Sequence, residues 1–306
     1  MTEKMVYPSK IMLVGEYGVV VGGSALTIPF LKFHARIRST EDIPSGREED
    51  AKRSLEYIQL LYRYIRNLPE DSFHALPDLE TFSRNLNTYW LDLNIPIGSG
   101  LGSSGAVTAA IYDLFFPGAQ NLTLEQQKED LAQIESYFHG KSSGVDALTC
   151  HAGNSLRFHS NGSIDRVQFH PDQIPGGYRF FLMDFGEKFD TGPLVHHFLN
   201  QMNDQNFRRS IEEEYLPMNQ KLIETLLGER EADPGLLVRL LSDYQFQAFR
   251  KMIPDNMADL WIDGQVSNEY YLKLNGSGGG LMLGITHQSS MEALEERWND
   301  QLIWVE

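Results

Sequence analysis

The feature that most constrains the fold is a glycine-rich loop directly before a strong helix-forming segment. The stretch PIGSGLGSSGA, residues 96–106, contains four glycines and three serines, and the segment VTAAIYDLF follows it. Glycine loses much conformational entropy on folding, so such a cluster is typical of backbone that needs positive φ or approaches a ligand closely. A helix that starts at the serines points unpaired N–H groups and the positive end of its dipole outward. We therefore expect an anion site, with phosphate as its ligand.

Net charge limits the partners of this site. The chain has 26 basic and 42 acidic side chains, which give a net charge of −16. A general binder of nucleic acid or of anionic membranes is excluded, because such binders need positive charge. Local phosphate binding remains compatible, because backbone N–H groups and Mg²⁺ can supply it.

Cysteine content and apolar runs indicate the compartment. The single cysteine, Cys150, allows neither an internal disulfide nor a cysteine-based zinc site. The segment MTEKMVYPSK lacks the apolar core of a signal peptide, and no apolar run approaches the roughly 20 residues of a membrane span. We therefore expect a cytoplasmic protein with neither a membrane nor a nucleic-acid partner.

Hydrophobic periodicity predicts alternating strands and helices, which indicate an α/β class. Strands are expected over residues 5–14, 24–38, 87–96, 176–186, within 270–286, as a short pair around Asn161–Gly162 and near the C-terminus. Helices are expected over residues 48–68, behind the glycine loop as far as Pro117, over 124–138, through much of 192–255 and near 289–298. The segment HPDQIPGG is rich in proline and glycine and predicts a domain boundary near Asp172.

Common glycine and nucleophile motifs do not fit their required contexts. The loop contains the spacing GxGxxG, but no second strand ends in an acidic residue at the distance that a dinucleotide fold needs. Gly140-Lys141-Ser142 supplies the end of a Walker loop, but Glu135 stands where its first glycine is required. Residues 140–144 match GxSxG, yet a predicted helix precedes them instead of the strand of a serine-hydrolase elbow.

Three segments, in order, resemble the GHMP kinase superfamily. They are PSKIMLVGEYGVV (8–20), PIGSGLGSSGA (96–106) and KLNGSGGGLMLG (273–284). The resemblance implies a two-layer α/β (α+β) fold of two domains with ATP and substrate at their junction. Residues 1–172 would form the ATP-binding domain, which is similar to domain 2 of ribosomal protein S5 and has a left-handed βαβ unit. Residues 173–306 would form a ferredoxin-like C-terminal domain.

The resemblance also implies a phosphate loop and a Mg²⁺ site. The residues expected to bind the ATP phosphates are Gly98, Ser99, Gly100, Leu101, Gly102, Ser103 and Ser104. The Ser104 hydroxyl and the Glu135 carboxylate would be the metal ligands, in keeping with the preference of Mg²⁺ for hard oxygen atoms. On the sequence pattern alone, Glu135 is one more solvated acid on an amphipathic helix that also carries Glu129 and Asp130.

For catalysis, the resemblance implies that Asp146 accepts the proton of the substrate hydroxyl and that Lys10 stabilises the developing charge. Without the family resemblance, Lys10 is interpreted as an edge-strand lysine and Asp146 as a loop residue. We expect His139 to cap carbonyl groups at a helix end, and Ser142 and Ser143 to shape the turn before Asp146. The full set expected at the substrate is Lys10, Glu16, Asp146, Thr191, Gly276, Ser277 and Gly278. Thr191 is equally compatible with an N-cap.

The motifs of this chain resemble two kinds of kinase within the superfamily. HGKSSGVD and the KL before the third glycine loop resemble mevalonate kinases, whereas GEYGVV and GLGSSG look as much like phosphomevalonate kinases. Tyr17, Ser142, Asn275 and Leu281 replace a usual histidine, proline, threonine and glycine, so the acceptor pocket differs.

The resemblance therefore predicts phosphorylation of the primary hydroxyl of mevalonate. The alternatives are a phosphomevalonate kinase, another small-alcohol kinase of the superfamily, or a non-catalytic sensor of ATP or another ligand. A sensor would be expected to lack Lys10, Glu135 or Asp146, and all are present. Apolar stripes over 192–250 are compatible with a homodimer or with the core.

Overall fold

The computed structural model describes residues 6–184, 191–276 and 280–306. The chain packs as two compact units that are interleaved in sequence. Unit 1 comprises the chain up to Lys10, Pro29–Pro96 and Leu101–Asn154, and unit 2 comprises Ile11–Ile28, Ile97–Gly100 and Ser155–Glu306. Strands β1 (Val6–Val14) and β2 (Ala25–Ser39) contribute residues to both units.

The first sheet is built around the long strand β2. Its order is β1-β2-β4-β5, and β3 also pairs with β2. The partners are β3 (Tyr89–Leu93), β4 (Leu156–Phe158) and β5 (Ile164–Arg166). The start of β2 pairs with β4 in unit 2, where Ala25 lies opposite Phe158. The end of β2 pairs with β3 in unit 1, where Ala35 lies opposite Leu93.

The helices of unit 1 are α1 (Glu48–Arg66), α2 (Leu79–Arg84), α3 (Ser103–Phe115), α4 (Leu124–His139) and α5 (Val145–Ala152). Helices α1, α3 and α4 lie where the sequence predicts helices, whereas the sequence analysis missed α2 and α5; Asp146, interpreted there as a loop residue, lies in α5. Helix α1 buries Ile58, Leu61 and Ile65 along one face, as its helical spacing requires. Helix α4 begins with a capping box in which the Thr123 hydroxyl accepts from the Gln126 N–H and the Gln126 side chain accepts from the Thr123 N–H.

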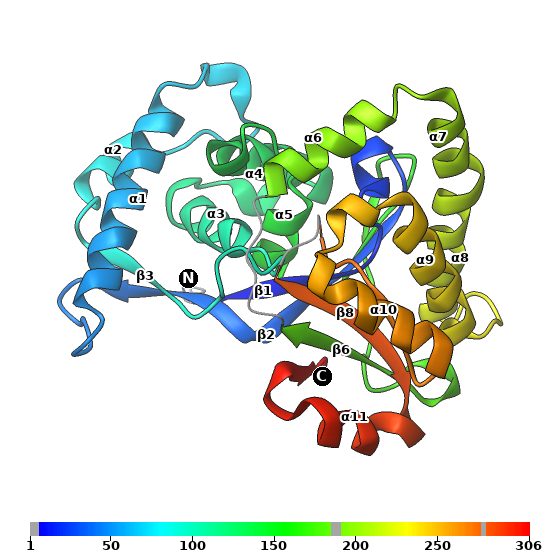
Figure 1. Ribbon diagram of the computed structural model, residues 1–306. Helices are drawn as coiled ribbons and strands as arrows, with labels where there is room; N and C mark the ends of the chain where they lie inside the picture. The colour runs from blue at the N-terminus through cyan, green and yellow to red at the C-terminus, as the bar shows by residue number, and fades with distance from the viewer. Residues whose placement is uncertain (1–5, 185–190, 277–279) are drawn as a thin grey trace. The chain divides into compact units, whose positions relative to one another are not determined.

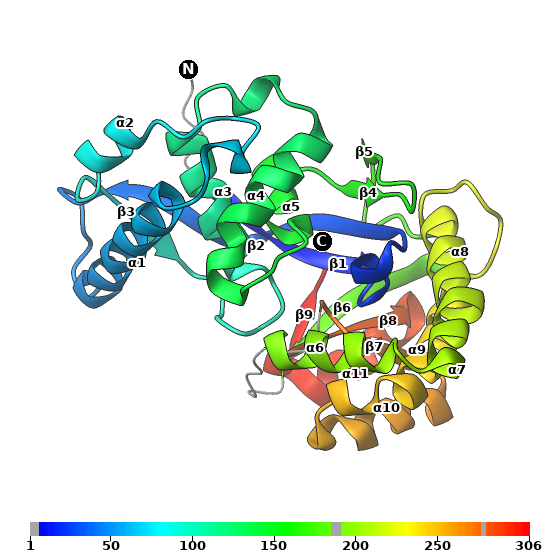
Figure 2. The same cartoon turned by 90° about the horizontal axis from the view of Figure 1, so that it is seen from above.

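Helices α3, α4 and α5 gather on one face of the strands of unit 1 (Figures 1 and 2). Small residues let α3 and α5 approach closely: Ala106, Ala109 and Ala110 are fully buried. A Cβ on Gly105 of α3 would lie 2.9 Å from the backbone N of Ala147 in α5. This close packing brings the first turns of α3 and α5 together.

Unit 2 contains a four-stranded antiparallel sheet of order β7-β8-β6-β9. Its strands are β6 (Tyr178–Asp184), β7 (Tyr270–Lys273), β8 (Leu281–His287) and β9 (Leu302–Trp304). With the intervening helices the chain order is βαββαβ, which is the ferredoxin-like arrangement. The predicted fold class is therefore confirmed.

The remaining helices of unit 2 fill the long connection from β6 to β7 and the one from β8 to β9. They are α6 (Thr191–Gln201), α7 (Gln205–Ser210), a π-helical turn (Ile211–Tyr215), α8 (Leu216–Leu226), α9 (Pro234–Ala248), α10 (Asp255–Ser267) and α11 (Met291–Trp298). Within the described ranges, no helix has both the length and the apolar character needed to cross a bilayer.

The compact units do not divide the chain at Asp172. Residues 11–28 pack with unit 2, and so does the segment from Ser155 onward, because β4 pairs with the start of β2. The division into 1–172 and 173–306 describes domains of a family rather than packing, and it stays a prediction.

Candidate functional site

The glycine loop adopts the backbone conformation that its composition predicts. Gly98, Gly100 and Gly102 have φ values of 77°, 78° and 75°, in the left-handed region that glycine adopts without strain. In unit 2, a Cβ on Gly100 would lie 2.7 Å from the backbone O of Asn275. In unit 1, a Cβ on Gly102 would lie 3.0 Å from Cγ of Lys10. The loop thus needs glycine both for its φ angles and for close approach.

Lys10 and Asp146 form an ion pair beside this loop. Lys10 Nζ lies 3.0 Å from Asp146 Oδ2, and the two side chains are 1% and 33% exposed. The Lys10 N–H donates to the carbonyl of Leu101 at 2.9 Å, which joins β1 to the loop. Gly144, with φ of 73°, precedes α5 and places Asp146 in its first turn. Lys10 does lie on a strand at the edge of the sheet order, but its side chain is a buried cation, and its carboxylate partner reaches solvent.

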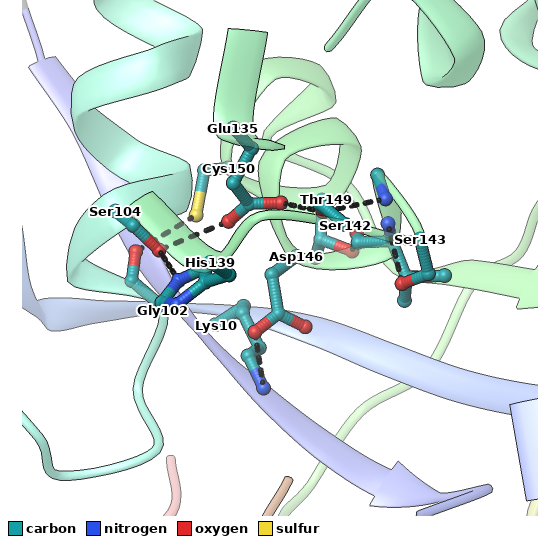
Figure 3. Close-up of polar contacts among 12 residues, drawn as sticks. Lys10, Gly102, Ser104, Glu135, His139, Ser142, Ser143, Asp146, Thr149 and Cys150 are labelled. Atoms are coloured by element: carbon teal, nitrogen blue, oxygen red, sulfur yellow. Dashed lines mark hydrogen bonds and ion pairs between the residues drawn. The ribbon is translucent and has the colours of Figure 1, made fainter. Parts of the chain in front are cut away.

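Glu135 of α4 lies in a second polar cluster (Figure 3). It is 3% exposed. Its carboxylate accepts hydrogen bonds from Ser104 Oγ at 3.0 Å and from Ser142 Oγ at 2.5 Å. His139 Nε2 lies 3.0 Å from Ser104 Oγ, so this ring faces the cluster and does not serve as the helix cap that we expected. The interpretation of Glu135 as a solvated helix-face acid is wrong.

The environment of Glu135 favours its neutral form. Burial, and then the charge of Asp146, raise the pKa of Glu135 to about 7. Hydrogen bonds from Ser142 and Ser104 and the charge of Lys10 act in the opposite direction. Unit 1 therefore brings together two carboxyl groups and one ammonium: Glu135 near the end of α4, Asp146 in the first turn of α5, and Lys10 on β1.

The turn between α4 and α5 is shaped by its serines, as the sequence predicts. Ser142 Oγ accepts from the N–H of Gly144 at 3.0 Å, and Ser143 Oγ accepts from the N–H of Val145 at 3.4 Å. Ser142 also donates to Glu135, a contact that the sequence analysis missed. A serine in place of the usual proline thus adds a donor to the Glu135 carboxylate.

The oxygen atoms of Ser104 and Glu135 fit a Mg²⁺ site in which the protein supplies only some of the ligands. They are adjacent, hard ligands at the N-terminus of α3. Among the residues that the structure describes, no group of three His, Cys, Asp or Glu side chains forms a metal cluster. Mg²⁺ commonly uses one or two protein ligands together with phosphates and water, so this donor set suits it.

In unit 2, the first and third motifs meet in a different way from that expected. Glu16 pairs with Lys273, and neither side chain is exposed. The sequence analysis noted the KL of the third motif but assigned Lys273 no role. Thr191 begins α6, with its side chain outside the described residues, and Gly276 has φ of 65°. Ser277 and Gly278 also lie outside the described residues.

Two of the departures from the family pattern are buried packing residues. Tyr17 is 3% exposed, and its ring centroid lies 5.0 Å from that of Phe198 and 5.2 Å from that of Phe249. Burial, and then the charge of Glu16, raise the pKa of its hydroxyl well above the usual range. Leu281 is 2% exposed at the start of β8. Both residues are accommodated by the core of unit 2.

Comparisons with known proteins find matches to one kinase superfamily. Residues 60–154 match the family model described as GHMP kinases N terminal domain. A curated mevalonate kinase from Archaeoglobus fulgidus is 28% identical over 199 residues, which cover 61% of this chain and 60% of the relative. The chain thus spans less than two thirds of the length of that relative.

Solved structures show the same fold. The crystal structure of L. major mevalonate kinase in complex with R-mevalonate superposes with a TM-score of 0.64 at 18% identity, covering 99% of this chain and 95% of that one. Streptococcus pneumoniae phosphomevalonate kinase superposes with a TM-score of 0.62, also at 18% identity, covering 98% and 97%. Residues 60–154 thus match the GHMP kinase N-terminal domain, the curated relative is a mevalonate kinase, and the chain has the fold of the solved mevalonate and phosphomevalonate kinases.

Proposed function

We propose that this protein transfers the γ-phosphoryl group of ATP to the primary hydroxyl of mevalonate, with Mg²⁺. The observation that carries the proposal is the ion pair between buried Lys10 and partly exposed Asp146, next to Gly102. A cation and a carboxylate at this distance are what proton removal from an alcohol requires. Both side chains also lie against Gly102, which caps the N-terminus of α3, and a helix N-terminus is suited to phosphate.

In the proposed step, Asp146 accepts the hydroxyl proton as the substrate oxygen attacks the γ-phosphorus. A new P–O bond forms, the bond from the γ-phosphorus to the bridging β-oxygen breaks, and ADP leaves with that electron pair. The Lys10 ammonium stabilises the negative charge that develops on the substrate oxygen. Asp146 is 33% exposed, so a substrate hydroxyl has access to it.

The phosphate loop supplies most of the remaining catalysis, which in phosphoryl transfer is positioning and charge neutralisation. Residues 98–104 would bind the phosphates through backbone N–H groups and the N-terminus of α3. Ser104 and Glu135 would hold the Mg²⁺, which neutralises phosphate charge when bound. The serine donors to Glu135 keep its carboxylate oriented toward this position.

Mevalonate is favoured as the acceptor because a mevalonate kinase is a curated relative over 199 residues. The HGKSSGVD segment, which holds Asp146, points the same way. Phosphomevalonate is the second candidate, since the first two motifs resemble phosphomevalonate kinases equally well. The packing of Tyr17 against Phe198 and Phe249 supports a pocket that differs from the usual histidine-containing one.

The deciding experiment measures ADP release with Mg²⁺ and ATP in the presence of mevalonate, phosphomevalonate, homoserine or galactose. Turnover with mevalonate alone is expected. Turnover only with phosphomevalonate would transfer the assignment to that acceptor, and ATP binding without turnover on any of the four would favour a sensor. We also assign the protein to the cytoplasm, and a fluorescent fusion would test this.

A further inference from the structure

A buried ion pair in unit 2 lies outside the proposed chemistry. Glu16 follows β1 in the first motif, and Lys273 ends β7 in the third. Both side chains are fully buried, and Lys273 Nζ donates to Glu16 Oε1. Removing two charges from water is costly, and a buried pair is often no more stable than a well-packed apolar one. Stability alone is therefore a weak explanation for this pair.

The neighbours of the pair hold the backbone at Leu274 from two directions. Lys273 Nζ also donates to the carbonyl of Leu274 at 2.9 Å. The Leu274 N–H donates to Gln245 Oε1 at 2.8 Å. Gln245 Nε2 donates to Tyr215 Oη, and that hydroxyl donates to the carbonyl of Glu16, both at 2.9 Å. The network thus closes from the first motif, through α9, to the end of β7.

The backbone held in this way supports the glycine loop. Asn275 follows Leu274, and its carbonyl O lies 2.7 Å from where a Cβ on Gly100 would be. The N–H of Gly280 donates to the carbonyl of Gly98 at 3.2 Å. Asn275 and Gly280, both in the third motif, therefore contact the part of the glycine loop that belongs to unit 2. A shift at Leu274 would be transmitted directly to Gly100.

We infer that Glu16 and Lys273 are positioning residues that hold the end of β7 against Gly98 and Gly100, and so set the conformation of the phosphate loop. This role differs from the substrate contact that the family resemblance implies for Glu16. The nucleotide part of the inference rests on the proposed function. The positioning of the loop itself does not.

The test is the double variant Glu16→Gln/Lys273→Met, which removes both charges with little change in volume. Single variants are avoided because each leaves an unpaired buried charge. Amide hydrogen exchange without ligand is expected to quicken at Leu274 and Gly280, while Ile285 of β8, which does not pair with Lys273, is unchanged. In turnover assays the KM for ATP is expected to rise about tenfold, with a smaller change in kcat, because the loop is misplaced before chemistry.

A second variant and a control keep the outcome decisive. Gln245→Met breaks the same network without altering a charge and is expected to quicken exchange at Gly280, whose N–H bonds the glycine loop and not Gln245. Arg209→Gln/Glu213→Gln removes an exposed pair, 74% and 61% exposed, and should change neither quantity. Folded network variants with normal exchange at Leu274 and Gly280 would overturn the inference, as would normal KM for ATP in an active enzyme. If the natural protein shows no turnover but the exchange result holds, the proposed function fails and the positioning role stands.

Discussion

Lys10 shows most clearly how burial turns an ordinary residue into a candidate for chemistry. A lysine that is 1% exposed needs a nearby opposite charge, and Asp146 supplies it at 3.0 Å. The strand pattern around Lys10 contains no sign of this, because the partner lies 136 positions away in sequence. From the sequence, only the family resemblance assigned the two residues to the same site.

Substitution of either partner should abolish most turnover while leaving nucleotide binding intact. For Lys10→Met and Asp146→Asn we expect kcat to fall by roughly 10²- to 10⁴-fold, the usual contribution of positioned acid–base groups. ATP affinity, measured by calorimetry, should remain near that of the natural protein. Near-normal kcat in both variants would exclude the pair from the chemistry.

Glu135 and Glu129 lie on the same helix, and their sequence contexts look alike. Their exposures differ: Glu135 is 3% exposed, whereas the Glu129 side chain is 65% exposed. Asp130 is also fully buried, where it accepts from the N–H groups of His74 and Ala75 and from Tyr112 Oη. Helical periodicity predicts which residues share one face of α4. Which acidic residues are buried depends on the packing of α3 and of residues 73–75 against that helix.

The metal assignment predicts a specific change in Mg²⁺ dependence. Ser104→Ala and Glu135→Gln should raise the free Mg²⁺ concentration for half-maximal rate by about 10- to 100-fold, the range for altered metal surroundings. Glu129→Gln on the same helix is the matched control and should behave as the natural protein. Rates are measured against free Mg²⁺ at saturating ATP, and an unchanged Mg²⁺ curve in both site variants would remove them from the metal site.

At the level of elements, the glycine loop couples backbone conformation to the site. Gly102 ends the loop, caps α3 and lies against the side chain of Lys10. The φ requirement was predictable from composition. The contact with Lys10 was not, because it depends on how β1 passes under the first turn of α3.

Gly102→Ala should therefore lower the free energy of unfolding by more than the strain of a left-handed backbone alone, because the added Cβ would also meet Lys10. Gly118 is the matched control, since its φ is 103° and a Cβ there meets nothing within 4 Å. Gly118→Ala should lower the free energy of unfolding by about 1–2 kcal/mol from left-handed strain alone, without loss of activity. Gly102→Ala should lose more stability, measured by urea denaturation, and also lose kcat/KM. Equal losses in both variants would show that the Lys10 contact is unimportant.

At the scale of the whole molecule, the proposed reaction requires ligand-linked stabilisation. With Mg²⁺ and ATP at about 100 times the Kd, the free energy of unfolding should rise by about 2.7 kcal/mol. Asp146→Asn should keep this increase, because the residue is proposed to act on the acceptor, whereas Ser104→Ala should reduce it. Thermal denaturation with and without Mg²⁺ and ATP measures both, and a natural protein that gains no stability would contradict nucleotide binding.

The sequence by itself determined most of the elements, though not α2 and α5, together with the order of the three motifs and the fold class, because periodicity, caps and glycine φ requirements are local properties. The helix bounds of α1 and α4 and the left-handed glycines follow directly from neighbouring residues. Tertiary structure decided which charges are buried and paired. The contacts between Lys10 and Asp146, Ser104 and Glu135, and Glu16 and Lys273 join residues far apart in sequence. Burial depends on all the surfaces that pack around a side chain, and no local pattern contains that information.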